Sequence, residues 1–211
     1  MKMNIAILLY ERFTALDAIG PYEVLGRLPG ATLRFVAAER GPVVTDNGLL
    51  TLVAEHSIEE VPETDIVLVP GGPGEVAARA GGPVLEWLGA VHETSTWTTS
   101  VCTGSLILAA AGLLEGRRAT SHWLALEELR ELGAQPVSER VVFDGKIVTA
   151  AGVSAGIDMA LALAAEVAGE AVAQAIQLGI EYDPQPPFDA GSPRTAPAEI
   201  VAAARARSRF A

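Results

Sequence analysis

Short apolar runs of strand length alternate along the chain with longer segments in which apolar residues recur at helical spacing. Almost every position in these runs is apolar or β-branched, which is typical of strands covered on both faces. The predicted strands are residues 3–10, 32–38, 65–70 and 96–101, with a short one near 119–120. Two hairpins are also expected, the first around Asn47–Gly48 and the second over 141–150 with Asp144–Gly145 at its turn.

The segments between the strands predict helices, whose ends are marked by capping residues and closing glycines. They are expected over 14–28, 83–93, 103–111, 124–132, 154–169 and 169–182, the first one bent or broken at Gly20–Pro21. Residues 183–199 are rich in proline and are expected to be irregular.

Alternating strands and helices predict an α/β fold with a mostly parallel sheet sandwiched between helices. We expect one domain over 1–182, followed over 183–211 by a Pro-rich tail and a short end segment.

Composition and charge narrow the class of protein. Fifteen basic and 26 acidic residues give a net charge of −11, which disfavours binding to nucleic acid or anionic membranes and favours neutral or cationic small molecules. A single cysteine excludes an internal disulfide, and three scattered histidines predict no metal site. The first apolar run is too short for a signal peptide or a membrane span, so a cytoplasmic enzyme is expected.

The one cysteine, Cys102, lies where a predicted strand meets a predicted helix, with Ser100 and Gly104 two positions to either side. A nucleophile elbow needs this pattern, because its tight turn crowds the neighbours while exposing the nucleophile. The helix N-terminus is expected to lower the pKa of the thiol below its usual value of about 8.5. The alternative is a buried cysteine that only packs.

A glycine-rich loop, GGPG, follows the strand at 65–70. Residues 72–77 formally match a dinucleotide-binding pattern, but the next strand ends without the acidic residue that such a site requires. We expect Gly71 and Gly72 instead to bring backbone N–H groups close to a reacting atom, as an oxyanion hole requires. The alternative is a turn that binds nothing.

Asp17 and His122 are the other candidate site residues. Asp17 lies in the apolar sequence FTALDAIGP, where a carboxylate is costly to bury without partners. It can also be read as an acid favoured by the N-terminus of a helix. His122, in ATSHW, follows a short strand and is placed to contact the elbow, or it is a polar residue at a helix start. In such sheets ligands bind outside the carboxyl ends of the strands, where these segments converge.

The chain resembles the ThiJ/PfpI superfamily in four motifs that occur in the family's order: LDAIGPYEVL, VLVPGGPG, SVCTGSLILAAAGLLEGRRATSHW and TAAGVSAGIDMALALAAEVAG. The resemblance runs from residue 17 to about 169. It implies the class I glutamine amidotransferase-like fold, which is flavodoxin-like.

Within the superfamily, Asp17, the sequence CTGS and the ending IEYDPQPPFDAGSP are similar to the isonitrile hydratase branch. The resemblance implies cofactor-free addition of water to an isonitrile through a cysteine thioimidate, giving an N-substituted formamide. It further implies that Cys102 is the nucleophile, Asp17 the acid/base partner and Thr103 an essential neighbour, and that the protein is a homodimer.

Two departures from other branches matter. Thr103 stands where the protease-like branch has histidine, so peptidase activity is not expected. The regulator branch adds a helix-turn-helix domain, for which the residues after Tyr182 are too few. The remaining alternatives are another cysteine-dependent enzyme of the superfamily, glyoxalase-like or amidase-like, and a non-catalytic redox or ligand-sensing module.

Overall fold

The computed structural model describes residues 2–210, and a seven-stranded sheet runs through its centre. The strand order is β10-β11-β7-β6-β1-β2-β5, and only β10 is antiparallel to its neighbour. The strands are β1 (Met3–Leu8), β2 (Ala31–Ala37), β5 (His56–Ser57), β6 (Ile66–Val69), β7 (Trp97–Val101), β10 (Val141–Asp144) and β11 (Ile147–Ala150). The predicted α/β fold with a mostly parallel sheet is confirmed.

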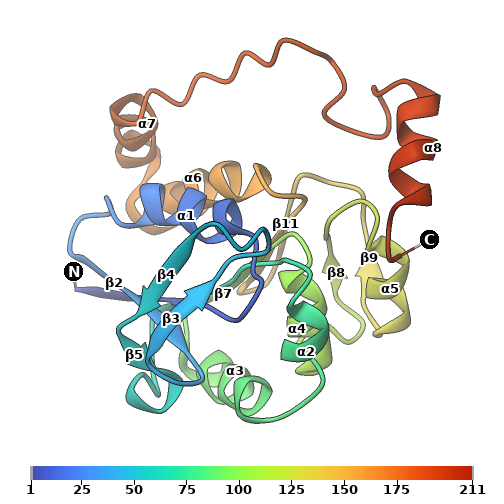
Figure 1. Ribbon diagram of the computed structural model, residues 1–211. Helices are drawn as coiled ribbons and strands as arrows, with labels where there is room; N and C mark the ends of the chain where they lie inside the picture. Colours follow the sequence, from blue (N-terminus) through green and yellow to red (C-terminus); the bar gives the residue numbers. More distant parts are fainter. Residues whose placement is uncertain (1, 211) are drawn as a thin grey trace.

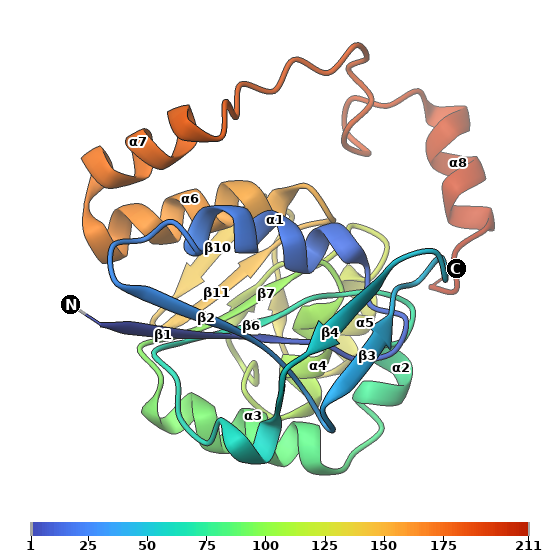
Figure 2. The ribbon, with the colours of Figure 1, turned by 60° about the vertical axis from the view of Figure 1, so that its left-hand side comes forward.

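Helices cover both faces of the sheet, which is why every residue of the central strand β6, IVLV, is apolar and buried. Figure 2 shows α1 (Ala15–Leu25) and α6 (Ala155–Ala168) on one side of β1, β6 and β7, and α3 (Pro83–Thr94) on the other. The short helices α2 (Glu75–Ala78) and α5 (Leu126–Glu131) pack against α4 (Gly104–Ala110). Helix α7 (Glu170–Gly179) lies on α6, and a 3-10 turn, η1, spans Ile58–Glu60.

Two small sheets lie outside the central one. The expected first hairpin is β3 (Gly41–Val44) with β4 (Thr51–Ala54), and β8 (Arg118–Ala119) pairs in parallel with β9 (Gln135–Pro136). The turn of the β3–β4 hairpin is bound to the segment before α1, because the Thr14 hydroxyl donates a hydrogen bond to Asp46 at 2.8 Å. The hairpin is therefore fixed next to the start of α1.

Helix α1 departs from its expected course. It ends at Leu25 rather than Leu28, and Pro21 lies inside it without ending it. Gly20 faces Ile157 so closely that a Cβ at this position would lie 3.0 Å from the Ile157 side chain. Close packing of α1 on α6 thus holds a continuous helix at a position where the sequence predicts a bend or a break, and the break does not occur.

The end of the chain, residues 183–210, is here called the tail. Figure 1 shows the tail leaving α7, crossing above α6 and α1, and continuing into α8 (Ala198–Ala206). The irregular segment expected over 183–199 ends at Pro197, and the sequence analysis missed α8. Its alanines are the signal for it, since alanine has the highest helix propensity.

Among residues 2–210, no helix is both long and apolar enough to cross a membrane.

Candidate active site

Cys102 lies immediately after β7 in a sharp turn, with a left-handed backbone φ of 56°. Its N–H donates to the carbonyl oxygens of Ala150 at 3.1 Å and Ala151 at 3.0 Å, at the end of the adjacent strand β11. Its carbonyl oxygen accepts hydrogen bonds from the hydroxyls of Ser105 at 3.2 Å and Ser121 at 3.0 Å. This conformation is unfavourable for a residue with a side chain, and contacts on both sides of the peptide maintain it.

Gly104 is the small residue that the elbow requires after the cysteine. A Cβ at Gly104 would lie 2.1 Å from the carbonyl oxygen of Val69, at the end of β6. Only glycine lets α4 begin this close to the neighbouring strand.

Asp17 projects from the first turn of α1 and is wholly buried. One carboxyl oxygen, Oδ2, accepts a hydrogen bond from the Gly71 N–H at 2.8 Å. Among residues 2–210, no N–H or O–H group donates to the other oxygen, Oδ1. A Cβ at Gly71 would lie 2.9 Å from Oδ2 and 2.5 Å from the Thr103 nitrogen, so glycine is needed for these segments to meet.

The Asp17 carboxyl and the Cys102 thiol influence each other electrostatically. Burial raises the pKa of Asp17 to about 7, against the hydrogen bonds from the Gly71 N–H and the Cys102 thiol that lower it. Burial and the Asp17 charge together raise the pKa of Cys102 well above its ordinary value. At neutral pH the site therefore contains a thiol beside a carboxyl group that is partly ionised.

The expectation of a lowered thiol pKa is wrong. Cys102 is only 6% exposed and lies beside a carboxyl group, so the charged form of the thiol is poorly solvated and is repelled. Hydrogen bonds from the N–H groups of Val153 and Thr103 lower its pKa, but they are the smaller effects. Helix α4, with seven residues, does not reverse this balance.

The two loop glycines do not present free N–H groups, contrary to expectation. The Gly71 N–H is bonded to Asp17, and the Gly72 N–H donates to the Thr103 hydroxyl at 3.0 Å. These glycines hold the acid and the residue after the cysteine in place. The backbone groups that lower the pKa of the thiol belong to Thr103 and Val153. The sequence analysis missed Val153, because no local pattern marks it.

The remaining loop glycines accommodate the protein's own backbone rather than a phosphate. A Cβ at Gly72 would lie 2.5 Å from the Thr14 nitrogen, and one at Gly74 would lie 1.8 Å from the Glu11 carbonyl oxygen. The dinucleotide pattern at 72–77 thus has a packing explanation. Residues 2–210 contain no cluster of three His, Cys, Asp or Glu side chains that could hold a metal ion.

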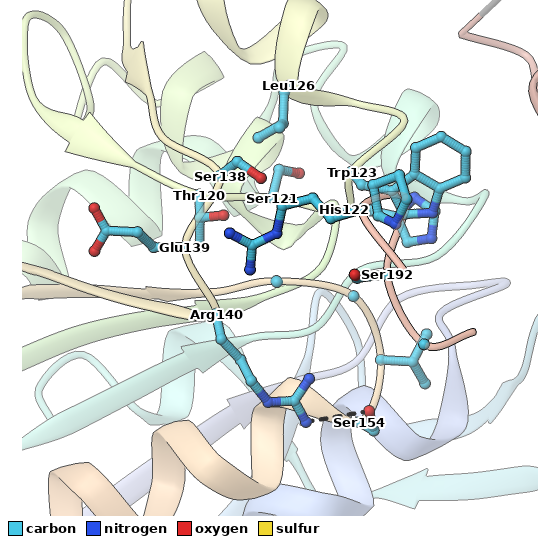
Figure 3. A pocket seen from close by; sticks show the side chains of 16 residues that line it. Thr120, Ser121, His122, Trp123, Leu126, Ser138, Glu139, Arg140, Ser154 and Ser192 are labelled. Atoms are coloured by element: carbon cyan, nitrogen blue, oxygen red, sulfur yellow. Dashed lines mark hydrogen bonds between the residues drawn. The ribbon is translucent and has the colours of Figure 1, made fainter. Parts of the chain in front are cut away.

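A cavity of about 380 Å³ adjoins the elbow. Two of its lining residues, Ser121 and Ala151, form hydrogen bonds with the backbone of Cys102, and a third, Val153, lowers the pKa of its thiol. Neither Cys102 nor Asp17 lines the cavity itself. Figure 3 shows His122 and Trp123 at one end of the cavity, with Arg140 and its hydrogen bond to Ser154 below. The lining combines hydroxyl groups and the charged side chains of Glu139, Arg140 and Arg194 with the apolar surfaces of Trp123 and Leu126.

His122 belongs to this cavity rather than to the Cys102–Asp17 pair. Its ring centre lies 5.9 Å from that of Trp123, and its Nδ1 accepts a hydrogen bond from the Leu124 N–H at 3.3 Å. Burial lowers the pKa of His122, which favours the neutral ring. His122 is therefore a neutral side chain that lines the cavity.

Comparison with known proteins identifies the family. Residues 3–166 match the family model described as DJ-1/PfpI family. The chain belongs to this family. The chain is 44% identical to isonitrile hydratase of Pseudomonas putida over 208 residues, which are 99% of this chain and 91% of that protein.

Other relatives in the family differ in what they share with the chain. A crystal structure of a ThiJ/PfpI family protein from Pseudomonas syringae has a TM-score of 0.94 and 40% identity, over 98% of this chain and 86% of that one. The HTH-type transcriptional regulator CdhR of Pseudomonas aeruginosa is 32% identical over 163 residues, which are 74% of this chain and 48% of the regulator. The resemblance to the ThiJ/PfpI superfamily is thereby confirmed.

Proposed function

We propose that this protein hydrates isonitriles to N-substituted formamides, with Cys102 as nucleophile and Asp17 as acid and base. The observation that carries the proposal is the wholly buried carboxyl of Asp17, with a pKa raised to about 7, beside the only thiol of the chain. Such a group can both release and accept a proton near neutral pH. The 44% identity to an isonitrile hydratase supports the same assignment.

The first step forms a covalent intermediate. In the reactive form the pair holds one proton, as the Cys102 thiol beside the Asp17 carboxylate. Sulfur attacks the terminal carbon of R–N≡C while Asp17 takes the thiol proton and passes it to the same carbon. One S–C bond and one C–H bond form, and the product is a thioimidate, R–N=CH–S–protein.

The second step releases the product. Asp17, again a carboxylate, takes a proton from water as the water oxygen attacks the thioimidate carbon. That proton goes to nitrogen, the S–C bond breaks, and the second proton of the water returns to sulfur by way of Asp17. The products are R–NH–CHO and the thiol. The N–H groups of Thr103 and Val153 stabilise negative charge on the sulfur as it leaves.

Thr103 acts in this scheme as a positioning residue. Its hydroxyl accepts the hydrogen bond from the Gly72 N–H, and its own N–H is directed at the sulfur. The threonine therefore joins the glycine loop to the elbow.

The test is direct. Purified protein is incubated with cyclohexyl isocyanide in D₂O, and the formamide is analysed by NMR. We expect deuterium on the formyl carbon, because the C–H proton comes from exchangeable groups. Cys102→Ser and Asp17→Asn should give no product while keeping the fold.

The matched control is Asp65→Asn, which neutralises an acid at the opposite end of β6, where it accepts a hydrogen bond from the Asn4 N–H at 2.7 Å. It should retain wild-type turnover. A wild-type protein that hydrates no linear, cyclic or aromatic isonitrile would overturn the assignment. The alternative enzymes and the sensing module would then be tested with glyoxals, with amides and by oxidation of Cys102.

We further propose that the protein acts as a homodimer in the cytoplasm. The β3–β4 hairpin carries exposed apolar side chains, with Leu49 90% exposed and Val53 57% exposed, and a second subunit would remove them from water. Light scattering should give twice the chain mass of 21.9 kDa. A mass equal to one chain at micromolar concentration contradicts the dimer, and fractionation of cells tests the location.

A further inference from the structure

The tail forms one wall of the cavity beside Cys102. Residues 191–194 line it, facing the side formed by Thr120–Trp123. Figure 3 shows Ser192 entering the cavity near His122 and Trp123. A substituent bound there would contact the tail as well as the core of the protein.

Two anchoring contacts fix the end of the tail. The guanidinium carbon of Arg205, on α8, lies 5.1 Å from the centre of the Trp123 ring, which itself lines the cavity. Beyond α8, Arg209 Nη2 lies 2.5 Å from Glu75 Oε1. These contacts hold α8 against the rim of the cavity.

Glu75 is an unusual partner for a residue near the end of a chain. Its side chain is wholly buried, and its second oxygen pairs with Arg79 Nε at 2.7 Å. Because the Glu75 carboxyl is buried, loss of Arg209 would leave it with Arg79 as its one remaining cationic partner within residues 2–210. The chain therefore uses a buried charge to fix its tail.

Glu75 also adjoins the loop that positions the catalytic groups. Its N–H donates to the Gly72 carbonyl oxygen at 3.0 Å, and the Gly72 N–H binds the Thr103 hydroxyl. The Arg209 contact thus connects the tail, through Glu75, to the glycine loop.

The tail lies outside the residues that match the family model but inside the alignment with one relative. The family match ends at residue 166, whereas the alignment with the P. putida isonitrile hydratase covers 99% of this chain and so includes most of the tail. The segment is shared with the relative named for this reaction and lies outside the part that matches the family model.

We propose that the tail determines which isonitriles this protein accepts, with Arg205 and Arg209 as positioning residues that keep residues 191–194 in the cavity wall. The inference rests on the proposed function, since it concerns the substituent R of R–N≡C. A cavity of about 380 Å³ has room for a ring-sized substituent, which would lie on the apolar surfaces of Trp123 and Leu126. Much of the rest of the lining is polar and includes the charged side chains of Glu139, Arg140 and Arg194. A small isonitrile would not reach the tail.

The first experiment separates KM from kcat in the full-length protein. In Arg209→Gln we expect KM for cyclohexyl isocyanide to rise about tenfold, because the substituent loses one wall of its pocket. KM for methyl isocyanide should rise by a smaller factor, since so small a molecule cannot span the cavity. Arg205→Gln tests the other anchoring contact and should shift KM in the same direction.

Arg207→Gln is the matched control. Arg207 is exposed at the end of α8 and makes no ion pair within residues 2–210. This variant should behave as wild type with both isonitriles. Equal KM values for Arg207→Gln and Arg209→Gln with cyclohexyl isocyanide would overturn the proposal.

A second experiment does not depend on hydration. Cys102 is the only thiol, so its alkylation by iodoacetamide and by a bulky N-aryl maleimide reports access to the site. Arg209→Gln should accelerate the maleimide at least about fivefold relative to iodoacetamide, and Arg207→Gln should not. If the wild type hydrates no isonitrile but this ratio shifts, the proposed function fails and the role of the tail in gating the cavity stands. An unshifted ratio refutes that role whatever the wild type hydrates.

Discussion

Asp17 and Cys102 are two acids in one buried space, and they titrate as a pair. The state with one proton is the reactive one, because a doubly protonated pair has no base to take the thiol proton. The Asp17 pKa of about 7 then sets the lower limit of the active pH range. Because the pKa of Cys102 is raised, the thiol keeps its proton when the pH rises above 7.

The pH dependence of hydration follows from this pairing. We expect kcat/KM, which reports ionisations of the free enzyme, to rise as pH increases through about 7 and then to level off. Initial rates at low isonitrile concentration between pH 5 and 9 measure this profile. A rate that falls steadily as pH rises from 5 would show that protonated Asp17 is the reactive form, contrary to the scheme.

The free energy of unfolding should fall as pH rises, whereas kcat/KM should increase. Unfolded Asp17 loses its proton near pH 4, whereas folded Asp17 keeps it up to about 7, so the folded state binds more protons in this window. Stability conferred by the protonated group is therefore lost as pH rises. Between pH 5 and 8 the wild type should lose about 3 kcal/mol relative to Asp17→Asn, measured by urea unfolding. Parallel stability curves for the two proteins would contradict the raised pKa.

At the scale of secondary-structure elements, the site depends on how closely α4 approaches the end of β6. Gly104 makes that approach possible, and Gly71 does the same for the loop after β6. The chain also offers a helical glycine with space around it: a Cβ at Gly89, in α3, would meet nothing within 4 Å.

Two alanine substitutions use this contrast. Gly104→Ala should destabilise the protein by at least about 2 kcal/mol, because the new Cβ overlaps the Val69 carbonyl oxygen and α4 must move. Gly89→Ala should stabilise it by roughly 0.5–1 kcal/mol through helix propensity. Thermal and urea unfolding of both variants test the pair. Equal effects would mean that the elbow can relax at little cost.

How well a feature could be predicted from the sequence depends on how far apart in the chain the interacting residues lie. Strands β1 and β6 were predictable because burial on both faces leaves apolar runs, and β7 because threonine, tryptophan and valine favour strands. The elbow was predictable because small residues flank Cys102. The bond from Gly71 to Asp17 joins residues 54 apart and has no local signal. The pKa of Cys102 was wrongly predicted, since the helix terminus is visible in the sequence and the depth of burial is not.

At the scale of the whole molecule, the core and the tail are held by different interactions. The central strands are fixed by buried apolar contacts, whereas residues 184–194 donate no backbone hydrogen bond within the described part of the chain. Local opening of the tail therefore costs much less free energy than unfolding of the sheet.

Amide hydrogen exchange should distinguish the tail from the core of the sheet. Residues 184–194 should exchange within seconds, α8 at an intermediate rate, and β1 and β6 only on global unfolding. Arg209→Gln should accelerate exchange in α8 at least about tenfold, whereas Arg207→Gln should leave it unchanged. Unchanged exchange in α8 of Arg209→Gln would contradict the role of the Arg209–Glu75 pair in holding the tail.

The backbone N–H of Cys102 is bonded to the carbonyl groups at 150 and 151, and this has a consequence for the order of assembly on the ribosome. When residue 102 emerges, β7 can pair with β6, but the strand that shapes the elbow has not yet been synthesised. The thiol is an ordinary cysteine until the β10–β11 hairpin is added beside β7 some fifty residues later. A nascent or prematurely ended chain therefore contains Cys102 but does not hold it in the elbow conformation. The thiol can act as a nucleophile only after β10 and β11 have joined the sheet.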